Sequence, residues 1–247
     1  MIIRRRQPLE PDEEHRLESY VRFWEHGYFS TSDGESEQAH AQPDFLRKQG
    51  LKPSDMFLDL GCGYLRGTIG LLDYLEDGHF FGIDISPSNI RRAQERASET
   101  SRHKPNLAVA SHFEIDQIWP NVGFDMILAA SVLTHLWPAD VEECIRKVSR
   151  VLRGKLFATI FKDNTLPVYG GWCGACIDHN DQHSVDPTMR TQNLADLNFC
   201  YNTIWLREAA KGCGLRVKEI GSTEIGQFML EISGENMGCN LPLSQPS

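Results

Sequence analysis

The 247-residue sequence contains no long hydrophobic run and no extended basic run. No apolar stretch approaches the roughly 20 residues that cross a membrane, so we expect neither a membrane span nor a membrane partner. Lys and Arg number 25 against 34 Asp and Glu, which gives a formal net charge of −9. Because nucleic-acid binding needs a cationic face, we expect no nucleic-acid partner. The one basic run, Arg4-Arg5-Arg6, is interpreted as a solvated tail.

Cysteine usage gives little support for a disulfide framework. The chain has seven cysteines, an odd number, and Cys62, Cys144 and Cys213 fall inside predicted core elements. This pattern suits reduced thiols in a cytoplasmic protein. Met1-Ile2-Ile3 is too short for the apolar region of a signal peptide, so we expect a cytoplasmic location.

Apolar runs and amphipathic stretches alternate along most of the chain, and 40% of the residues are hydrophobic. The alternation predicts an α/β fold, in which a mostly parallel sheet carries helices on both faces. The predicted strands are Met56–Leu60, His79–Asp84, Leu107–Ala110, Phe124–Ala129, Lys155–Phe161, Leu215–Ile220 and Gln227–Ile232. The predicted helices are Glu13–Trp24, Ser36–Gln49, Gly67–Leu75, Pro87–Thr100, Ala139–Leu152 and Trp205–Lys211.

These elements divide the chain into three parts. Residues 1–50 are predicted to be a helical extension or lid, and residues 51–233 the α/β domain. Within the domain, residues 163–202 are a long insertion without a clear period. Such lengths are usually functional or disordered, and we interpret this one as a substrate cover. Residues 234–247 lack any period, which predicts a disordered tail.

A glycine-rich turn follows the first strand of the domain, in the stretch Phe57-Leu58-Asp59-Leu60-Gly61-Cys62-Gly63-Tyr64-Leu65-Arg66-Gly67. Glycine lets a backbone approach a ligand closely, and the helix expected next presents unpaired N–H groups there. A dinucleotide fingerprint would place its third glycine where Arg66 stands. The acid at position 59 favours a ligand with an ammonium group over an anion, because like charges repel.

The string Leu58–Gly63 resembles motif I of the class I S-adenosylmethionine (SAM)-dependent methyltransferases. Phe80–Ser86 resembles their second strand, Phe124–Leu136 their fourth strand with its following loop, and Val151–Thr159 the passage into their fifth strand. The resemblance runs in family order over roughly positions 50–233. It implies the Rossmann-like methyltransferase fold, with a seven-stranded, mostly parallel sheet whose last strand is antiparallel, and SAM as the cofactor.

The resemblance gives two carboxylates the leading roles in cofactor binding. Asp59 is predicted to face the methionine ammonium, and Asp84 to accept both ribose hydroxyls, which suit two carboxylate oxygens. Gly61 and Gly63 would bring the backbone close to the cofactor. The alternatives are a turn acid for Asp59 and a helix N-cap or loop acid for Asp84. The family usually has a third glycine at position 65, where this chain has Leu65.

Further residues near the predicted strand ends complete the set of predicted cofactor contacts. Relatives carry an acid for the adenine amine near position 111 or 112, where this chain has Ser111 and His112. Phe113 is predicted to be an apolar wall for the adenine, with core packing as the alternative. The remaining predicted cofactor contacts are Cys62, Arg66, Ile85, Ser131 and Tyr28.

Two histidines are candidate catalytic bases. His135 follows the fourth strand, on the rim where an acceptor should meet the cofactor, and the alternative role is to anchor this loop. His26 is the second candidate. It lies in an aromatic N-terminal segment that often covers the cofactor in related enzymes, so Tyr28 is expected to shield SAM from water. The alternative for this segment is a helix end packed against the core.

The insertion contains a possible metal-binding pattern, C-x-x-C-x-x-H-x-x-x-H, formed by Cys173, Cys176, His179 and His183. Two thiolates and two imidazoles can hold zinc in a tetrahedral site. Structural zinc usually draws its ligands from two separated pairs, however. We therefore predict no metal and interpret the segment as a substrate-covering loop with free cysteines.

The sequence thus predicts an enzyme that transfers a methyl group from SAM to an O or N atom of a small-molecule acceptor, such as a metabolite or natural-product precursor. Acidic charge favours this class, although a basic protein or peptide acceptor stays open. One alternative is transfer of the aminocarboxypropyl arm or another alkyl group of SAM. Another is a non-catalytic SAM-binding partner subunit. A nicotinamide-dependent dehydrogenase is disfavoured by Arg66. Nothing indicates the oligomeric state.

Overall fold

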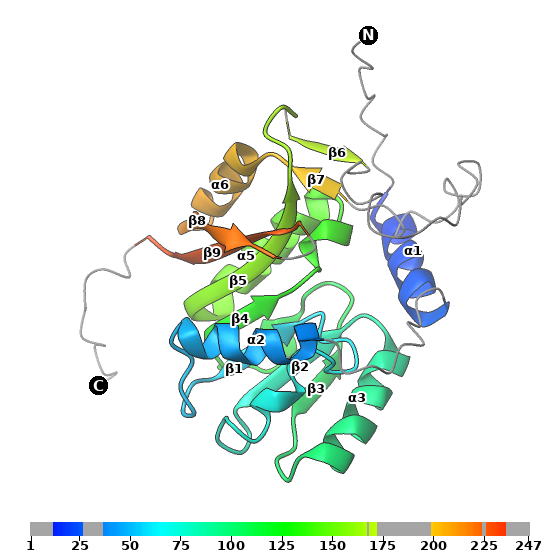
Figure 1. The fold of residues 1–247 in the computed structure, drawn as a ribbon. Helices are drawn as coiled ribbons and strands as arrows, with labels where there is room; N and C mark the ends of the chain where they lie inside the picture. The colour runs from blue at the N-terminus through cyan, green and yellow to red at the C-terminus, as the bar shows by residue number, and fades with distance from the viewer. Residues whose placement is uncertain (1–11, 27–36, 167, 172–198, 224–225, 236–247) are drawn as a thin grey trace, which may run out of the picture.

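The computed structural model describes residues 12–26, 37–166, 168–171, 199–223 and 226–235 (Figure 1). Its strands are β1 Phe57–Leu60, β2 Phe80–Asp84, β3 Asn106–Val109, β4 Phe124–Ala129, β5 Leu152–Lys162, β6 Tyr169–Gly171, β7 Phe199–Tyr201, β8 Leu215–Ser222 and β9 Phe228–Gly234. Its helices are α1 Glu13–His26, α2 Glu37–Lys48, α3 Pro87–Thr100, α4 Ile115–Ile118, α5 Pro138–Val151 and α6 Thr203–Lys211, with short 3₁₀ turns η1 Ile69–Leu71 and η2 Leu133–His135.

The central sheet has the strand order β3-β2-β1-β4-β5-β9-β8. The first five strands are parallel to one another, and β9 enters antiparallel between β5 and β8. This arrangement confirms the predicted seven-stranded sheet and its antiparallel last strand. The strands β1 and β2 are buried along their whole length, as expected for parallel strands covered on both faces.

Two further short strands, β6 and β7, extend the sheet at the end of β5. The last residues of β5, Phe161 and Lys162, pair with β7, whereas Lys155–Ile160 pair with β9. Strand β5 therefore runs beyond the predicted Lys155–Phe161 at both ends. The β6–β7 pair comes from the two ends of the segment predicted as an insertion, so the parts of that segment that the structure describes continue the sheet.

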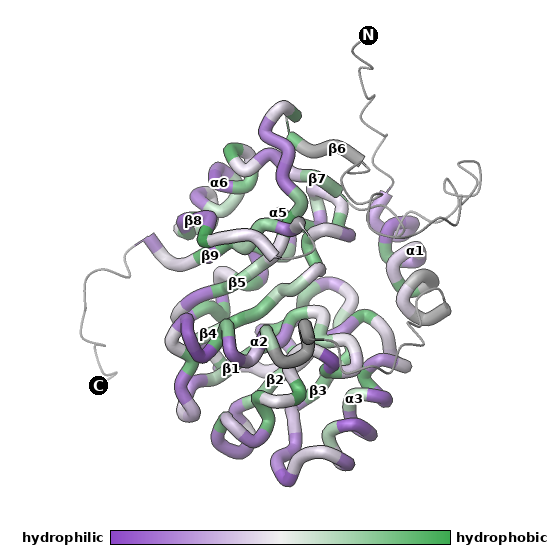
Figure 2. The backbone as a smooth tube through the Cα atoms, in the orientation of Figure 1, coloured by the Kyte–Doolittle hydropathy of each residue, from purple (hydrophilic) through white to green (hydrophobic). Residues whose placement is uncertain are grey.

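Helices cover both faces of the sheet, as the alternating pattern predicted (Figure 1). One core packs α2, η1 and α3 against side chains such as Phe57 and Phe157. The other packs α4, α5 and α6 against Leu58, Ile127 and Ile160. Successive strand residues point to opposite faces, which is why Phe57 and Leu58 belong to different cores. Figure 2 shows hydrophobic residues concentrated along the central strands and hydrophilic ones on the outer helices.

The predicted helix over Gly67–Leu75 is wrong. This segment forms turns around the three-residue η1, and Thr68 before it has φ −123°. Two glycines, Gly67 and Gly70, lower the helix propensity. In addition, Gln42 of α2 packs so closely over Gly67 that a Cβ there would lie 2.0 Å from its Oε1. Close packing against α2 thus determines this connection.

Helix α1 is fixed to the domain by a buried polar cluster, which we call the α1 latch: Arg16, Tyr20, Asp140 and Trp137. Arg16 donates two hydrogen bonds to the Asp140 carboxylate at 2.9 and 3.0 Å. The Tyr20 hydroxyl donates to Asp140 at 2.8 Å and accepts the Trp137 N–H at 2.9 Å. Because Arg16 and Tyr20 are buried, breaking the latch would leave polar groups without partners.

The described helices include none that is both long and apolar enough to cross a membrane.

Candidate active site

The candidate site lies at the carboxyl edge of the sheet, where β1 sits between β2 and β4. The strand order reverses at this point, because β2 and β3 follow β1 on one side while β4 and β5 lie on the other. Open α/β sheets bind ligands in the crevice at such a reversal. The residues that end β1, β2 and β4 therefore define the place to look.

The turn after β1 is built from left-handed backbone conformations. Gly61 has φ +72°, Gly63 φ +52° and Leu65 φ +62°. The Gly61 N–H donates to the Ile83 carbonyl at 2.8 Å, which ties this turn to the end of β2. A Cβ at Gly61 would lie 2.5 Å from Val132, whereas a Cβ at Gly63 would meet nothing within 4 Å. Gly61 thus permits contact with the loop after β4, and Gly63 leaves open space for a ligand.

Leu65 occupies the family's third glycine position and still adopts the conformation that glycine favours. Its side chain is fully buried against the core beneath α2 and α3. A left-handed conformation costs a non-glycine residue roughly 1–2 kcal/mol. Burial of the leucine side chain offsets that strain, since it is worth about 1.5–3 kcal/mol. The loop therefore keeps its path without the glycine.

Asp84 lies at the end of β2 and is held by donors from two directions. Its Oδ2 accepts the Gly63 N–H at 2.8 Å, and its Oδ1 accepts the Ser86 N–H at 2.9 Å and the Asn89 amide at 3.2 Å. Asp84 is 8% exposed. The contact with Gly63 joins the two predicted cofactor motifs directly. The N-cap of α3 is Ser86, whose hydroxyl accepts the Asn89 N–H, so Asp84 is not the N-cap residue.

Asp59 is buried at the adjoining position on β1. Its Oδ2 accepts the Thr68 hydroxyl at 2.5 Å. Burial raises the pKa of Asp59 from its usual 3.8 to about 7; the Thr68 hydrogen bond lowers the pKa and the charge of Asp84 raises it. A buried carboxyl group near a second carboxylate gains strongly from a cationic partner.

Three loops along the carboxyl edge each contain one non-glycine residue with positive φ: Leu65 after β1, Phe113 (φ +54°) after β3 and Ser131 (φ +56°) after β4. Strained conformations of this kind concentrate at functional sites. Phe113 packs against the core and is partly exposed, so the structure is compatible with either of its predicted roles. Ser131 is held by Thr159 and Gln227, from β5 and the start of β9.

The other predicted cofactor residues lie near the same edge but differ in exposure. The Cys62 thiol is 6% exposed and packs into the core, where burial raises its pKa. Arg66 is exposed, and Ile85 packs partly buried against the core. His112, which stands where relatives carry an acid for the adenine amine, has its Nδ1 3.2 Å from a carboxylate oxygen of Glu13. This contact places the loop after β3 beside α1.

His135 ends η2 and contacts α1. Its ring meets that of Trp24 edge-on, with centroids 5.3 Å apart. Burial lowers the pKa of His135 to about 4, so the imidazole is neutral at pH 7. A base with this pKa removes a proton from an ordinary hydroxyl or ammonium group poorly, because efficient catalytic bases have a pKa near the operating pH. The geometry supports the anchoring alternative for His135.

Several predictions lie outside the described residues. These are Tyr28, the side chain of His26, and the four potential zinc ligands Cys173, Cys176, His179 and His183. Over the part of the chain that is described, no group of three or more His, Cys, Asp or Glu residues could hold a metal ion. Cys62, Cys144 and Cys213 are free cysteines.

Sequence reasoning missed three polar residues at this edge: Thr68, Thr159 and Gln227. Thr68 contacts Asp59 from nine positions away, and a hydroxyl shortly after a glycine turn was an available signal. Gln227 contacts Ser131 from 96 positions away. No local pattern could have predicted that contact, which depends on β9 entering the sheet beside β5.

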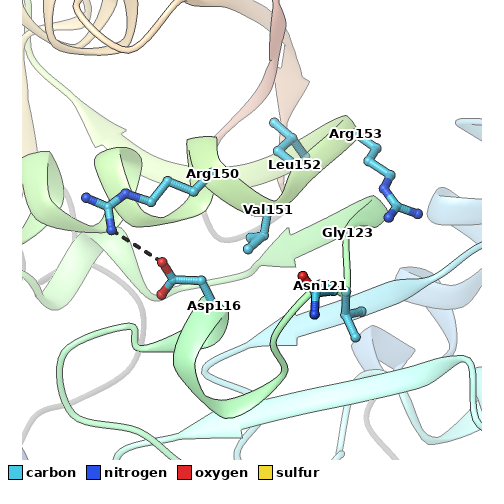
Figure 3. Close-up of a pocket in the computed structure, with 8 residues that line it drawn as sticks. Asp116, Asn121, Gly123, Arg150, Val151, Leu152 and Arg153 are labelled. Atoms are coloured by element: carbon cyan, nitrogen blue, oxygen red, sulfur yellow. Dashed lines mark hydrogen bonds and ion pairs between the residues drawn. The ribbon is translucent and has the colours of Figure 1, made fainter. Parts of the chain in front are cut away.

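A hollow lies at the opposite, amino edge of the sheet (Figure 3). It encloses about 320 Å³ and is lined by Asp116, Asn121, Val122, Gly123, Arg150, Val151, Leu152 and Arg153. Arg150 pairs with Asp116 at 3.3 Å, and both side chains are partly exposed. None of the predicted site residues lines this hollow.

The residues at the carboxyl edge fit SAM. Asp59 and Asp84 supply two buried carboxyl groups for an ammonium group and a diol, and a nearby ammonium group would favour the ionised form of Asp59. The space at Gly63 allows a ligand to lie against the backbone.

Residues 58–154 match the family model described as a methyltransferase domain. The chain is 30% identical over 131 residues to the probable methyltransferase ltbC of Aspergillus luteorubrus, covering 51% of this chain and 46% of that protein. It is also 30% identical over 121 residues to phosphoethanolamine N-methyltransferase 1 of Arabidopsis thaliana, covering 47% of this chain and 22% of that protein. The matched region thus spans less than half the length of these relatives.

Solved structures share the fold at low identity. Magnesium protoporphyrin IX methyltransferase from Synechocystis PCC 6803 with bound SAM has a TM-score of 0.62 at 14% identity, covering 93% of this chain and 100% of that one. The glycopeptide N-methyltransferase MtfA complexed with SAM has a TM-score of 0.59 at 14% identity, covering 84% and 99%. Residues 58–154 thus match a methyltransferase domain, and the structure has the class I SAM-dependent methyltransferase fold that its motifs indicated.

Proposed function

We propose that this chain binds SAM at the carboxyl edge of β1, β2 and β4 and transfers its methyl group to an O or N atom of a small-molecule acceptor. The observation that carries the proposal is the pair of buried acids on neighbouring strands: Asp84 accepts the Gly63 N–H of the glycine turn, and Asp59 accepts the Thr68 hydroxyl just after that turn. A matched methyltransferase domain over residues 58–154 supports the same activity.

Each acid has a separate task in binding. Asp59 would hold the ammonium of the methionine part, and Thr68 fixes the orientation of its carboxylate. Asp84 would accept the ribose hydroxyls while its bonds to Gly63 and Ser86 keep it in place. With both acids ionised and no cation nearby, their charges repel. A bound ammonium group removes that cost, which favours a cationic ligand over an anionic one.

Bound SAM would supply a methyl carbon already activated by the sulfonium. The chain's own contribution is then mainly to align an acceptor with that carbon and to exclude water, and alignment can supply several powers of ten in rate. The α1 latch holds α1 beside the rim, with Trp24 against His135. We propose that His135 anchors this loop, and its assignment as a general base remains a prediction to be tested.

The charge of the chain and the polar side chains at the carboxyl edge favour a small acceptor. The chain carries a net charge of −9, which disfavours acceptors that are polyanionic. Polar side chains from the loop after β4 and from β5 meet at this edge, since the Ser131 N–H donates to the Thr159 hydroxyl. An acceptor of metabolite size could reach this edge and the cofactor together.

The test combines binding and turnover. Calorimetry should detect SAM and S-adenosylhomocysteine (SAH) but not NAD, and incubation with methyl-labelled SAM and a metabolite collection should label at least one small product. Binding of NAD without either sulfur ligand would refute the cofactor assignment. Cofactor binding with transfer of the aminocarboxypropyl arm, or with turnover only in a complex, would refute methyl transfer by this chain.

A further inference from the structure

Three polar side chains from different strands converge beside the proposed cofactor site, and we call them the edge triad: Ser131, Thr159 and Gln227. The Ser131 N–H donates to the Thr159 hydroxyl at 2.7 Å, and the Ser131 hydroxyl donates to Gln227 Oε1 at 3.1 Å. Ser131 follows β4, Thr159 lies within β5 and Gln227 directly precedes β9. None of these contacts is local in sequence, so the fold itself builds the triad.

Two residues of the triad are nearly buried, and Ser131 is partly exposed. Thr159 is 2% exposed and Gln227 is 5% exposed. The Gln227 backbone is fixed by Thr223, whose hydroxyl accepts the Gln227 N–H at 3.1 Å. Its Nε2, in contrast, has no hydrogen-bond partner among the described residues. Nε2 is not among the buried polar atoms that lack a partner, although the residue as a whole is nearly buried. This spare donor pair therefore reaches solvent at the edge, where it is available to a ligand.

The triad shares a face of the sheet with the two acids. Asp59 pairs in register with Leu128, and Leu128 pairs with Phe157, so these three side chains point the same way. Thr159 lies two residues after Phe157 and therefore faces that side as well. Gln227 joins the same face through Ser131. All these residues border the carboxyl edge.

The distances between the strands put the edge triad where a methyl acceptor would lie beside the cofactor. Neighbouring strands are about 4.8 Å apart, so β4 and β5 lie roughly 5 and 10 Å across the edge from β1. The acids occupy β1 and β2, on one side of the strand-order reversal, and the triad occupies β4, β5 and β9 on the other. Val132, adjacent to Ser131, contacts the backbone at Gly61. The triad thus adjoins the cofactor loop on the side that the acids leave unused.

The geometry points to Gln227 as a specificity-determining residue whose Nε2 donates a hydrogen bond to an oxygen atom of the methyl acceptor. Ser131 and Thr159 act as positioning residues, because the Ser131 hydroxyl fixes the Gln227 side chain through its Oε1 and the Thr159 hydroxyl holds the Ser131 backbone. The acceptor class is then a small molecule that carries a hydroxyl, carbonyl, carboxylate or phosphate oxygen close to the methylated atom. This inference rests on the proposed methyl transfer and goes beyond it by naming the acceptor contact.

The experiment uses the SAH-loaded full chain and a defined panel of phenol, benzoate, ethanolamine and phosphoethanolamine. Calorimetry measures the binding of each compound to the wild type and to Gln227→Leu, which removes both polar atoms at similar size. Gln117→Leu makes the same change at an exposed glutamine of α4 and serves as the matched control. SAH affinity is measured for all three proteins, and circular dichroism checks that each is folded.

We expect at least one panel compound to bind the wild type and to lose about 10-fold or more in affinity with Gln227→Leu, as loss of one buried hydrogen bond predicts. SAH affinity should stay within about twofold, and Gln117→Leu should match the wild type. Thr159→Val should weaken binding of the same compound less than Gln227→Leu, because it only loosens Ser131.

Two results would overturn the inference. One is unchanged panel binding in Gln227→Leu, or no binding of any compound to the SAH-loaded wild type. The other is loss of SAH affinity in Gln227→Leu, which would assign the glutamine to the cofactor. If the wild type itself fails to bind SAH, the proposed function fails instead, so the two failures are distinguishable.

Discussion

The two edges of the sheet differ in how they treat polar side chains. At the carboxyl edge, Asp59, Asp84, Thr159 and Gln227 are all at most 8% exposed, and hydrogen bonds between elements hold them. At the amino edge, the Asp116–Arg150 pair borders an open hollow, with side chains 31% and 49% exposed. Strain follows the same division, since three of the four described non-glycine residues with positive φ lie at the carboxyl edge.

This difference shows that a hollow alone is a poor guide to a site. The amino edge has room for a ligand, but its Asp116–Arg150 pair is partly exposed, and exposed ion pairs contribute at most about 1 kcal/mol. The carboxyl edge concentrates buried charge and strained backbone, both of which cost stability and are typical of functional sites. The predictions below test that contrast by pairing changes at the two edges.

The largest effect is expected when one acid at each edge of the sheet is replaced by asparagine. The two substitutions are Asp84→Asn at the carboxyl edge and Asp116→Asn at the amino edge. Asp84→Asn should weaken SAH binding about 100-fold, because it removes a charged acceptor from the ribose site. Asp116→Asn, at the amino edge, should leave SAH affinity unchanged. Calorimetric titration of both variants measures this difference. Equal SAH affinity in the two variants would remove the distinction between the edges.

The second test compares the stability effect of glycine substitutions at one residue with positive φ on each edge, Leu65 and Asn121. Leu65→Gly relieves strain but empties a buried site, so we expect a net loss of about 2–4 kcal/mol in the free energy of unfolding. Asn121→Gly, at the amino edge with φ +67°, should change it by no more than about 0.5 kcal/mol. Urea denaturation measures both. A more stable Leu65→Gly protein would show that leucine burial does not offset the strain.

The pH dependence of SAH binding tests Asp59. Burial raises the pKa of Asp59 to about 7, so below that pH the carboxyl is neutral and attracts the ligand ammonium weakly. SAH affinity should therefore fall up to about tenfold per pH unit as the pH decreases below 7, and level off above it. Asp59→Asn should bind more weakly at pH 8 and lack this slope. Titrations from pH 5.5 to 8.5 measure both proteins.

The stability of the ligand-free chain should show the opposite trend. The folded state keeps a proton on Asp59 between its usual pKa of 3.8 and about 7, while the unfolded chain loses it. The stability contributed by that protonated form is therefore present below 3.8 and is lost as the pH rises to about 7. A slope that persists unchanged in Asp59→Asn would assign the effect to other groups.

The smallest effect is expected at His135. His135→Phe keeps an aromatic ring against Trp24 and should retain methyl transfer within about threefold, whereas His135→Ala should lose more because it empties the contact. Turnover with labelled SAM measures both. If His135→Phe loses two to four powers of ten in turnover while SAH affinity is retained, His135 is the general base after all.

The sequence predicted the elements whose signals are local. Strand β4 lies at its predicted residues Phe124–Ala129, and α3 begins at Pro87 after its Ser86 cap. The placement of Asp59 and Asp84 at the carboxyl ends of β1 and β2 was predicted because each lies at the end of an apolar run, next to glycines or a helix start. These features depend on residues close together in the chain, so the pattern contains them.

The parts that escaped prediction depend on distant contacts. The turn at Gly67 follows from packing against Gln42, and the α1 latch joins Arg16 and Tyr20 to Asp140 over more than 100 positions. The edge triad exists only because β9 enters the sheet beside β5. Local sequence patterns do not specify which distant residue contacts a given position. These contacts could therefore be identified only from the three-dimensional structure.

A crystal structure of the protein with SAH tests the central claim most directly. The account predicts the nucleoside at the carboxyl edge, with its ribose hydroxyls on Asp84, its ammonium facing Asp59 and its backbone contacts at Gly61 and Gly63. SAH found in the amino-edge hollow beside Arg150, or bound with either acid turned away from it, would contradict the account.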